Sequence, residues 1–219
     1  MKRLSFFIVC LMLAAPFITC PARTFAEPGK SIQLPAPQTD GGKPLMQALK
    51  DRSSGREFST ENLPLQVLSD LLWAACGINR PDSGKRTAPS AKDFQEIDVY
   101  AAMIDGLYRY DAEKNTLKLI LAEDIRAFTG KQRFAADAPV NLVYVADFSK
   151  VAGDTELEKT LYAGADTGFI SQNVYLFCAS QGLATVVRGY VDKPALEKKM
   201  GLKPHQKVIL AQTVGYPKK

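Results

Sequence analysis

The chain has 219 residues, 46% of them hydrophobic, and carries a formal net charge of +5. Three of its 28 basic residues, Lys2, Arg3 and Arg23, fall within the first 26 positions, which hold no acidic residue. Beyond that segment, 25 basic side chains (28 − 3) face 23 acidic ones, a net charge of only +2. So small a charge argues against a nucleic-acid-binding protein, and the remaining length is enough to form one hydrophobic core.

The N-terminus has the layout of a secretory signal peptide. A basic start, Met1–Arg3, precedes an apolar run over residues 4–18 and a small-residue cleavage site at Thr24–Ala26. We expect a signal peptide over residues 1–26 rather than a membrane anchor, because the apolar run is short for spanning a bilayer. The mature protein is then exported to the periplasm or cell envelope and has no stable membrane span.

The rest of the chain is predicted to be an arm followed by one domain. Residues 27–43 are rich in Pro, Gly, Gln and Asp, which indicates a flexible N-terminal arm. Residues 44–219 show no internal repeat. Their apolar patterns favour a single α+β domain in which helices cover a mixed or antiparallel sheet.

Elements are expected in the following chain order. A short helix over Leu45–Asp51 precedes an amphipathic helix over Pro64–Cys76, which Gly77 ends. A polar loop over Arg80–Gln95 leads into a meander of three strands and then into a buried central strand. The meander strands are Ile97–Met103, Leu107–Tyr110 and Leu117–Ile120, and the central strand is Leu142–Ala146. Then come a long helix over Leu157–Gln181, a strand at Thr185–Val187, a helix over Lys193–Met200 and a strand at Val208–Ala211.

Cysteine and histidine usage argues against a metal site and against a hydrolase triad. Cys76 and Cys178 remain after the leader, either as separate buried apolar side chains, the more common outcome, or as a disulfide in an oxidising compartment. With His205 as the single histidine, no metal-ligand set is expected. There is no Gly-x-Ser-x-Gly elbow either, so a hydrolase triad is disfavoured.

Three polar segments carry the candidate chemistry. The first is Arg52-Ser53-Ser54-Gly55-Arg56-Glu57-Phe58, whose guanidinium and hydroxyl donors suit a phosphate-like anion. The second is the loop Arg86–Gln95, just before a strand. The third is the helix-to-strand turn Gly182–Gly189, where bare backbone is available to a ligand.

These segments resemble the motifs of the nitroreductase family of flavin enzymes. The first is similar to the family's Arg-x-Ser-x-Arg-x-Phe motif, and Pro89-Ser90-Ala91 followed by Gln95 is similar to its second flavin motif. Asp166–Asn173 with Gly182-Leu183, and then Val214–Pro217, resemble its long dimer helix and its C-terminal motif. The resemblance covers residues 44–217. It implies a three-layer sandwich, an intertwined homodimer, and FMN bound without a covalent link at the subunit interface.

The resemblance also implies roles for individual residues. Arg52, Ser53, Ser54 and Arg56 would hold the phosphate and ribityl chain, with Arg56 also near the pyrimidine edge. Ser90, Asp93 and Gln95 would approach the same flavin from the partner subunit. Backbone N–H groups at Val186 and Val187 would lie near the flavin N5, and Lys218 or Lys219 would reach the phosphate from the C-terminus. Many relatives carry Asn where this chain has Asp93, so that side chain either points elsewhere or accepts from a ring N–H.

The activity implied is an FMN-dependent oxidoreductase. Hydride would pass through flavin N5, in a ping-pong cycle, from a reduced donor such as NAD(P)H to a small nitro or quinone compound. No side chain is expected to be an obligatory acid or base. Two alternatives stay open. The meander also resembles the thiazole- and oxazole-forming dehydrogenase subgroup, which suggests a substrate-specific dehydrogenase, and export leaves room for a non-catalytic flavin-binding module.

Overall fold

The fold is an α+β sandwich built on a seven-stranded sheet. The computed structural model describes residues 31–153 and 155–218, so the predicted signal peptide lies outside the described residues. The strand order is β1-β6-β5-β4-β7-β9-β8, and every pairing among the described strands is antiparallel. The strands are β1 (Ser31–Gln33), β4 (Ile97–Met103), β5 (Gly106–Asp111), β6 (Thr116–Leu121), β7 (Val140–Asp147), β8 (Ala184–Arg188) and β9 (Gln206–Gly215).

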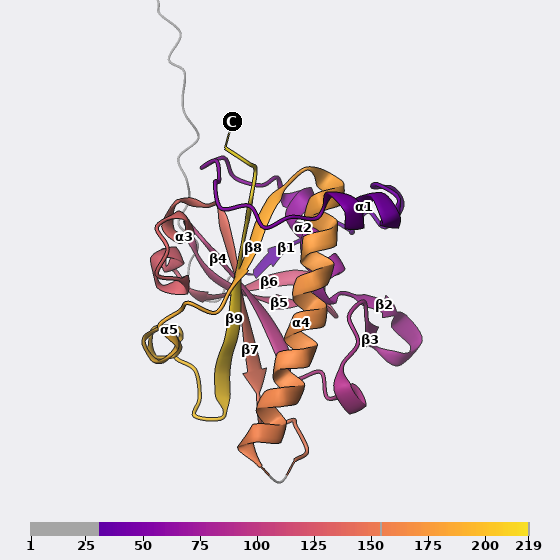
Figure 1. The fold of residues 1–219 in the computed structure, drawn as a ribbon. Coiled ribbons are helices and arrows are strands. Elements are labelled where there is room, and N and C mark those ends of the chain that lie inside the picture. The colour runs from indigo at the N-terminus through magenta and orange to yellow at the C-terminus, as the bar shows by residue number, and fades with distance from the viewer. Residues whose placement is uncertain (1–30, 154, 219) are drawn as a thin grey trace, which may run out of the picture.

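Central strand β7 shows why the sheet has helices on both faces. Its side chains alternate between the faces, as in any β-strand. Leu142 and Tyr144 enter one apolar cluster with residues of α2 (Leu65–Cys76) and α4 (Glu156–Gln181). Val143 and Val145 enter a second cluster with Leu196 of α5 (Lys193–Met200). Figure 1 shows α4 lying across the sheet, with α5 apart from it beside β9. The predicted three layers are therefore confirmed.

The helices begin and end where local signals place them. Helix α4 starts with a capping box: Glu158 N donates to Thr155 Oγ1 at 3.2 Å, and Thr155 N donates to the Glu158 carboxylate at 3.3 Å. It ends at Gly182, whose φ of 70° suits glycine. Helix α1 (Leu45–Asp51), α2 and α5 also match their predicted ranges closely. Of the helices described, none is long and apolar enough to cross a membrane.

The segment predicted as a flexible arm is instead part of the fold from residue 31 onward. Strand β1 pairs with β6 at the sheet edge, and Leu34 behind it is only 2% exposed. Ser69 Oγ donates to Pro35 O at 2.6 Å, which holds the segment against α2. The prediction failed because the prolines and glycines after Leu34 dominate the composition, while one short strand and one buried leucine are enough to anchor it.

The loop expected over Arg80–Gln95 also contains short ordered elements. Strands β2 (Ile78–Arg80) and β3 (Lys85–Arg86) form a small separate hairpin. Two 3₁₀ turns, η1 (Pro81–Ser83) and η2 (Ala91–Asp93), flank β3. Such short elements have too few residues to show a periodicity in the sequence.

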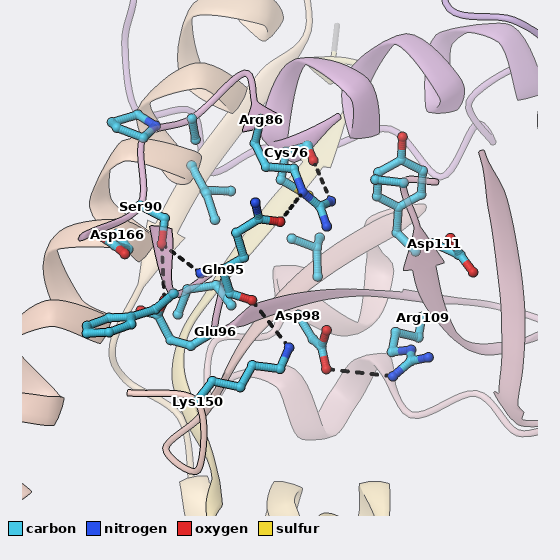
Figure 2. Close-up of a pocket in the computed structure, with 18 of the residues that line it drawn as sticks. Cys76, Arg86, Ser90, Gln95, Glu96, Asp98, Arg109, Asp111, Lys150 and Asp166 are labelled. Carbon is cyan, nitrogen blue, oxygen red and sulfur yellow. Dashed lines mark hydrogen bonds and ion pairs between the residues drawn. The ribbon is translucent and has the colours of Figure 1, made fainter. Parts of the chain in front are cut away.

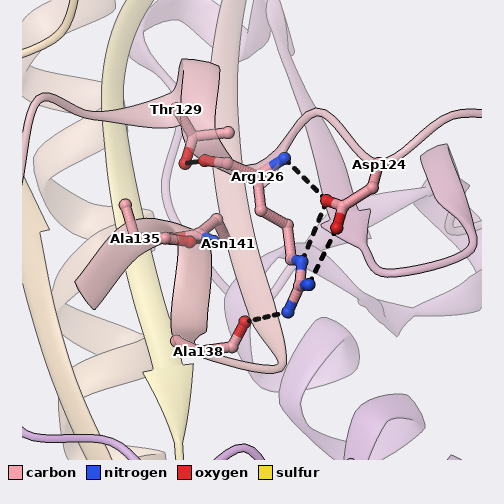
Figure 3. Close-up of polar contacts among 6 residues, drawn as sticks. All are labelled: Asp124, Arg126, Thr129, Ala135, Ala138 and Asn141. Carbon is pink, nitrogen blue, oxygen red and sulfur yellow. Dashed lines mark hydrogen bonds and ion pairs between the residues drawn. The ribbon is translucent and has the colours of Figure 1, made fainter. Parts of the chain in front are cut away.

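The segment of the chain between β6 and β7 covers the second face of the sheet, and a polar network holds it in place. It contains η3 (Arg126–Thr129) and α3 (Phe134–Asp137). Arg126 donates from Nε and Nη2 to Asp124 at 2.9 and 2.8 Å, and from Nη1 to Ala138 O at 2.8 Å (Figure 3). Asn141 of β7, fully buried, donates to Ala135 O at 2.7 Å. These bonds tie the segment to the sheet.

The two cysteines occupy buried apolar positions and are not linked to each other. Cys76 closes α2 and Cys178 lies near the end of α4, both within the cluster under these helices. Burial raises the pKa of Cys76 to about 12 and raises that of Cys178 as well. Both thiols are therefore unreactive at neutral pH.

Candidate functional site

The Arg/Ser segment, residues 52–58, runs directly against the start of β8. Gly55 N donates to Thr185 O at 3.0 Å. A Cβ atom at Gly55 would lie 3.1 Å from the Ala184 Cβ, tighter than an ordinary contact, so this approach favours glycine. At the far end of the segment, buried Phe58 forms a β-bridge with Pro217. The first and third polar segments, which the sequence predicted to converge, therefore do so.

Tyr175 of α4 joins these two segments. Its hydroxyl lies 2.9 Å from Ser54 Oγ and accepts a hydrogen bond from Val187 N at 3.0 Å. The Arg52 guanidinium lies over its ring, 5.3 Å from the centroid. Tyr175 was missed as a site residue by sequence reasoning, because a tyrosine within an apolar helix pattern is indistinguishable from core. The signal that could have found it is the position of α4 just before the turn into β8.

The other residues predicted from the first and third polar segments and from the C-terminus lie around the Tyr175 hydroxyl. Ser53 and Arg56 are exposed, and Arg56 Nη1 donates to Ser54 O at 3.4 Å. Val186 is buried at the base of the site. Lys218 N donates to Glu57 O at 3.2 Å, which brings the C-terminal segment alongside the Arg/Ser segment.

The charge of the Arg/Ser segment is uncompensated. Within residues 31–153 and 155–218, neither Arg52 nor Arg56 forms an ion pair with a carboxylate. Two guanidinium groups, neighbouring serine hydroxyls and closely approached backbone make a donor set that fits a phosphate monoester such as that of FMN. The same donor set contains no metal ligand, and the described residues hold no group of three His, Cys, Asp or Glu side chains suited to a metal ion.

The second predicted segment lines a separate cavity of about 430 Å³ (Figure 2). Ser90 Oγ accepts a hydrogen bond from Gln95 N at 2.9 Å. Gln95 Nε2 donates to Asp93 Oδ1 at 3.0 Å, and Arg86 Nε donates to Gln95 Oε1 at 2.9 Å. The Asp93 carboxylate is thus engaged by Gln95 within its own loop. Backbone φ values of 58° at Asp93 and 46° at Gln95 mark a strained loop, a feature that often accompanies functional sites.

Two buried carboxyl groups lie at this cavity and were not predicted. Glu96 is 0% exposed and Asp166 of α4 is 2% exposed. Asp166 Oδ2 accepts from Ala91 N at 2.9 Å, and Glu96 Oε2 lies 3.4 Å from Ser90 Oγ. Burial is the main cause that raises the pKa of Glu96. A backbone hydrogen bond and the Ser90 hydroxyl lower the pKa, the nearby Asp166 raises it, and the net shift is upward.

Within one chain, this cavity and the Arg/Ser segment lie at different levels of α4. Asp166 borders the cavity and Tyr175 borders the Arg/Ser segment. Nine residues of α-helix separate them, which is roughly 13 Å along the helix axis. The structure therefore brings Arg52, Ser54 and Val187 together, but it does not bring Ser90, Asp93 and Gln95 to them within a single protomer.

The fold and sequence match known proteins over most of the chain. The profile of the nitroreductase family matches residues 49–216. A Methanocaldococcus jannaschii protein assigned as a nitroreductase is 32% identical over 174 residues, 74% of this chain and 85% of the relative. The crystal structure of a protein from Ralstonia eutropha with the same assignment superposes with a TM-score of 0.82 at 43% identity, covering 86% of this chain and 90% of that one.

A more distant structure shares the fold alone. The NADPH:FMN oxidoreductase of Vibrio harveyi, solved in complex with NAD+, has a TM-score of 0.59 at 20% identity, over 80% of this chain and 69% of that one. The family profile and the relatives at 32% and 43% identity support a flavin oxidoreductase. The chain belongs to the nitroreductase family.

Proposed function

We propose that this protein is an FMN-dependent oxidoreductase, with the flavin phosphate held by Arg52, Ser53, Ser54 and Arg56. The observation that carries the proposal is the Tyr175 hydroxyl, which joins Ser54 and Val187. Beside them lie Arg52 and Arg56, which form no ion pair with a carboxylate of residues 31–153 or 155–218. Lys218 would add a further cation from the C-terminal segment. When bound, FMN would accept and release hydride at N5.

The protein's own groups would bind and orient the flavin. Arg52 and Arg56 would bind the phosphate by charge-assisted hydrogen bonds. The Val186 and Val187 backbone would lie near the ring edge. Since Val187 N already donates to Tyr175, that tyrosine would fix the strand beneath the ring instead of leaving the N–H free.

A homodimer would complete the site. Helix α4 exposes Leu157 (79%), Leu161 (69%) and Phe169 (47%), with Gly164 between them and open space beside it. Exposed apolar side chains on one helix mark a surface that a partner covers. Packing two such helices together would let the partner's cavity loop, the counterpart of residues 90–95, approach the flavin.

The reaction we propose is a ping-pong transfer from NAD(P)H to a small nitro or quinone compound. The Vibrio harveyi fold relative, an NADPH:FMN oxidoreductase solved with NAD+, supports a nicotinamide donor by analogy. The predicted signal peptide supports a periplasmic or cell-envelope location.

The test is flavin binding by Arg52→Ala/Arg56→Ala. Losing charge-assisted hydrogen bonds worth about 1.5–3 kcal/mol each should weaken FMN binding roughly 10²-fold or more, with the dimer retained. Fluorescence quenching of added FMN reports binding, and size-exclusion chromatography with light scattering reports the dimer. Arg133→Ala is the matched control, because Arg133 is exposed and pairs only loosely with Asp137 at 3.8 Å.

Two outcomes would redirect the proposal. A wild-type protein that is colourless and does not quench FMN would overturn it. FMN binding without bleaching by NADH or NADPH would keep the flavin site but favour a specific dehydrogenase or a binding module.

A further inference from the structure

Two carboxyl groups from distant parts of the chain line the cavity. Glu96 comes directly after the Ser90–Gln95 loop, and Asp166 projects from the middle of α4 (Figure 2). Each has one oxygen held by the loop: Oδ2 of Asp166 by Ala91 N, and Oε2 of Glu96 by the Ser90 hydroxyl. The loop therefore brings the two carboxyl groups together.

The second oxygen of each group lacks a donor. Glu96 Oε1 and Asp166 Oδ1 are buried, and no hydrogen-bond donor of residues 31–153 or 155–218 reaches either. Two adjacent buried carboxylates cannot both be ionised without a large cost. One proton held between them removes one charge and supplies the missing donor.

The cations that line the cavity do not neutralise the pair. Arg86 of β3 donates to Gln95 Oε1 and Cys76 O, and Lys150, after β7, donates to Gln95 O at 3.3 Å. Arg109 of β5 lies 3.8 Å from Asp98 of β4. The other charged groups on the wall, Asp111 and Glu113, are acidic and favour retention of the proton.

We propose that Glu96 and Asp166 hold one proton between them and supply it, through the Ser90 hydroxyl, to the substrate reduced at the proposed flavin site of the partner subunit. The inference rests on the proposed function. A quinone that receives a hydride still needs one proton to become a hydroquinone. In the structure the Ser90 hydroxyl donates to Glu96 Oε2. For delivery this hydroxyl turns to the substrate oxygen while Glu96 carries the pair's proton on Oε2. The Ser90 O–H bond then breaks as its proton moves to the substrate oxygen, and Ser90 Oγ takes the proton from Glu96 Oε2. The pair is left with two negative charges and recovers its proton from water.

The proton itself can be tested without flavin. Infrared spectra of the full chain at neutral pH, in H₂O and D₂O, should contain the C=O band of one protonated carboxyl group that shifts on deuteration. Glu96→Gln should remove the band while keeping an amide donor for Asp166. Glu113→Gln, an exposed carboxyl group at the same cavity, should leave it. A wild-type protein without the band, or a band that survives in Glu96→Gln, would overturn the proposal.

Delivery of the proton to the substrate is tested with the FMN-loaded protein and menadione as the quinone. The rate of flavin reoxidation should fall as pH rises past the point where the pair loses its proton. Glu96→Gln should lower the neutral-pH rate about 10²-fold, the lower end of general-acid effects. It should also abolish this fall of the rate at high pH, the alkaline limb of the pH–rate profile. Asp166→Asn removes the like charge and should move the limb to lower pH, a change that a merely structural role would not produce. Unchanged pH profiles in both variants would contradict proton delivery, whereas failure to bind FMN with the infrared band intact would contradict only the proposed function.

Discussion

The hydroxyl groups of Tyr175 and Ser54 lie 2.9 Å apart, although the residues are 121 positions apart in the chain. Tyr175 belongs to the long helix, and Ser54 belongs to the Arg/Ser segment. Because the same tyrosine oxygen also accepts from Val187 N, one side chain sets the spacing between the proposed phosphate donors and the strand beneath the proposed flavin ring.

Tyr175→Phe should therefore loosen the site without unfolding the protein. The change removes the acceptor of the Val187 N–H and the partner of Ser54, which should cost about 1 kcal/mol and weaken FMN binding several-fold. Fluorescence titration with FMN and thermal unfolding measure the two effects. Tyr162→Phe, on the same helix, is the control, since its hydroxyl has no hydrogen bond among the described residues. Equal FMN affinity in Tyr175→Phe and wild type would contradict the role.

Regular elements were predictable because their periodicity is local. The alternation in Ile97–Met103 and the apolar run of Leu142–Ala146 reflect burial on one or both faces of a strand, and each is visible in a few residues. The C-terminal end of α4 at Gly182 was visible in the same way, whereas the capping box at Thr155 was not predicted. The edge strand Ser31–Gln33 was not, because its stability comes from pairing with β6 and from Leu34, which lie outside any local pattern.

Candidate site residues could be proposed where a motif sits on consecutive residues and not where tertiary contacts create the candidate. Arg52, Ser54 and Arg56 could be assigned from one segment of the chain. Tyr175 gains its role from Ser54 and Val187, which lie beside α4. Glu96 gains its role from Asp166, which α4 places at the same cavity. A glutamate before a strand has no unusual feature in the sequence, and its burial against Asp166 follows from the packing of the loop on the helix.

Charging the exposed face of α4 should separate the proposed dimer. Leu157→Glu/Leu161→Glu puts two carboxylates where the structure exposes two leucines, so the fold should persist while association is lost. Analytical ultracentrifugation should detect a shift from dimer to monomer, accompanied by loss of FMN. Ile104→Glu is the matched control: Ile104 is 44% exposed but lies in the turn between β4 and β5. A double variant that stays dimeric would place the interface elsewhere.

Gly130→Ala should destabilise the protein through a buried arginine. A Cβ at Gly130 would overlap Arg188 Nη1, and Arg188 is only 4% exposed. Its guanidinium cannot move freely, because it donates to Thr129 O at 2.8 Å and to Asn141 Oδ1 at 2.9 Å.

Displacing this group leaves buried polar atoms unpaired, so we expect a loss of about 2–4 kcal/mol in the free energy of unfolding. Denaturant titration measures it. Gly153→Ala is the control, because its Cβ would meet neighbours at 3.5 Å or more. A Gly130→Ala protein as stable as wild type would show that the guanidinium has room to rearrange.

The Asp124–Arg126 pair should give the protein an acid-sensitive contribution to stability. Partial burial raises the pKa of Asp124, but its hydrogen bonds from Arg126 outweigh this and lower the pKa below the ordinary value of 3.8. A lowered pKa in the folded state means that the contribution is fully present above the unfolded-state pKa and is lost as pH falls through the folded-state pKa.

Asp124→Asn should thus be less stable than wild type at pH 7, and the difference should shrink below about pH 4. Because the Asp124 side chain is 40% exposed, solvent screening should keep the difference to about 1 kcal/mol or less. Denaturant titrations at several pH values measure it, with Asp137→Asn, at the exposed end of α3, as the control. A difference that stays constant down to pH 2 would show that the contribution of Asp124 does not depend on its charge.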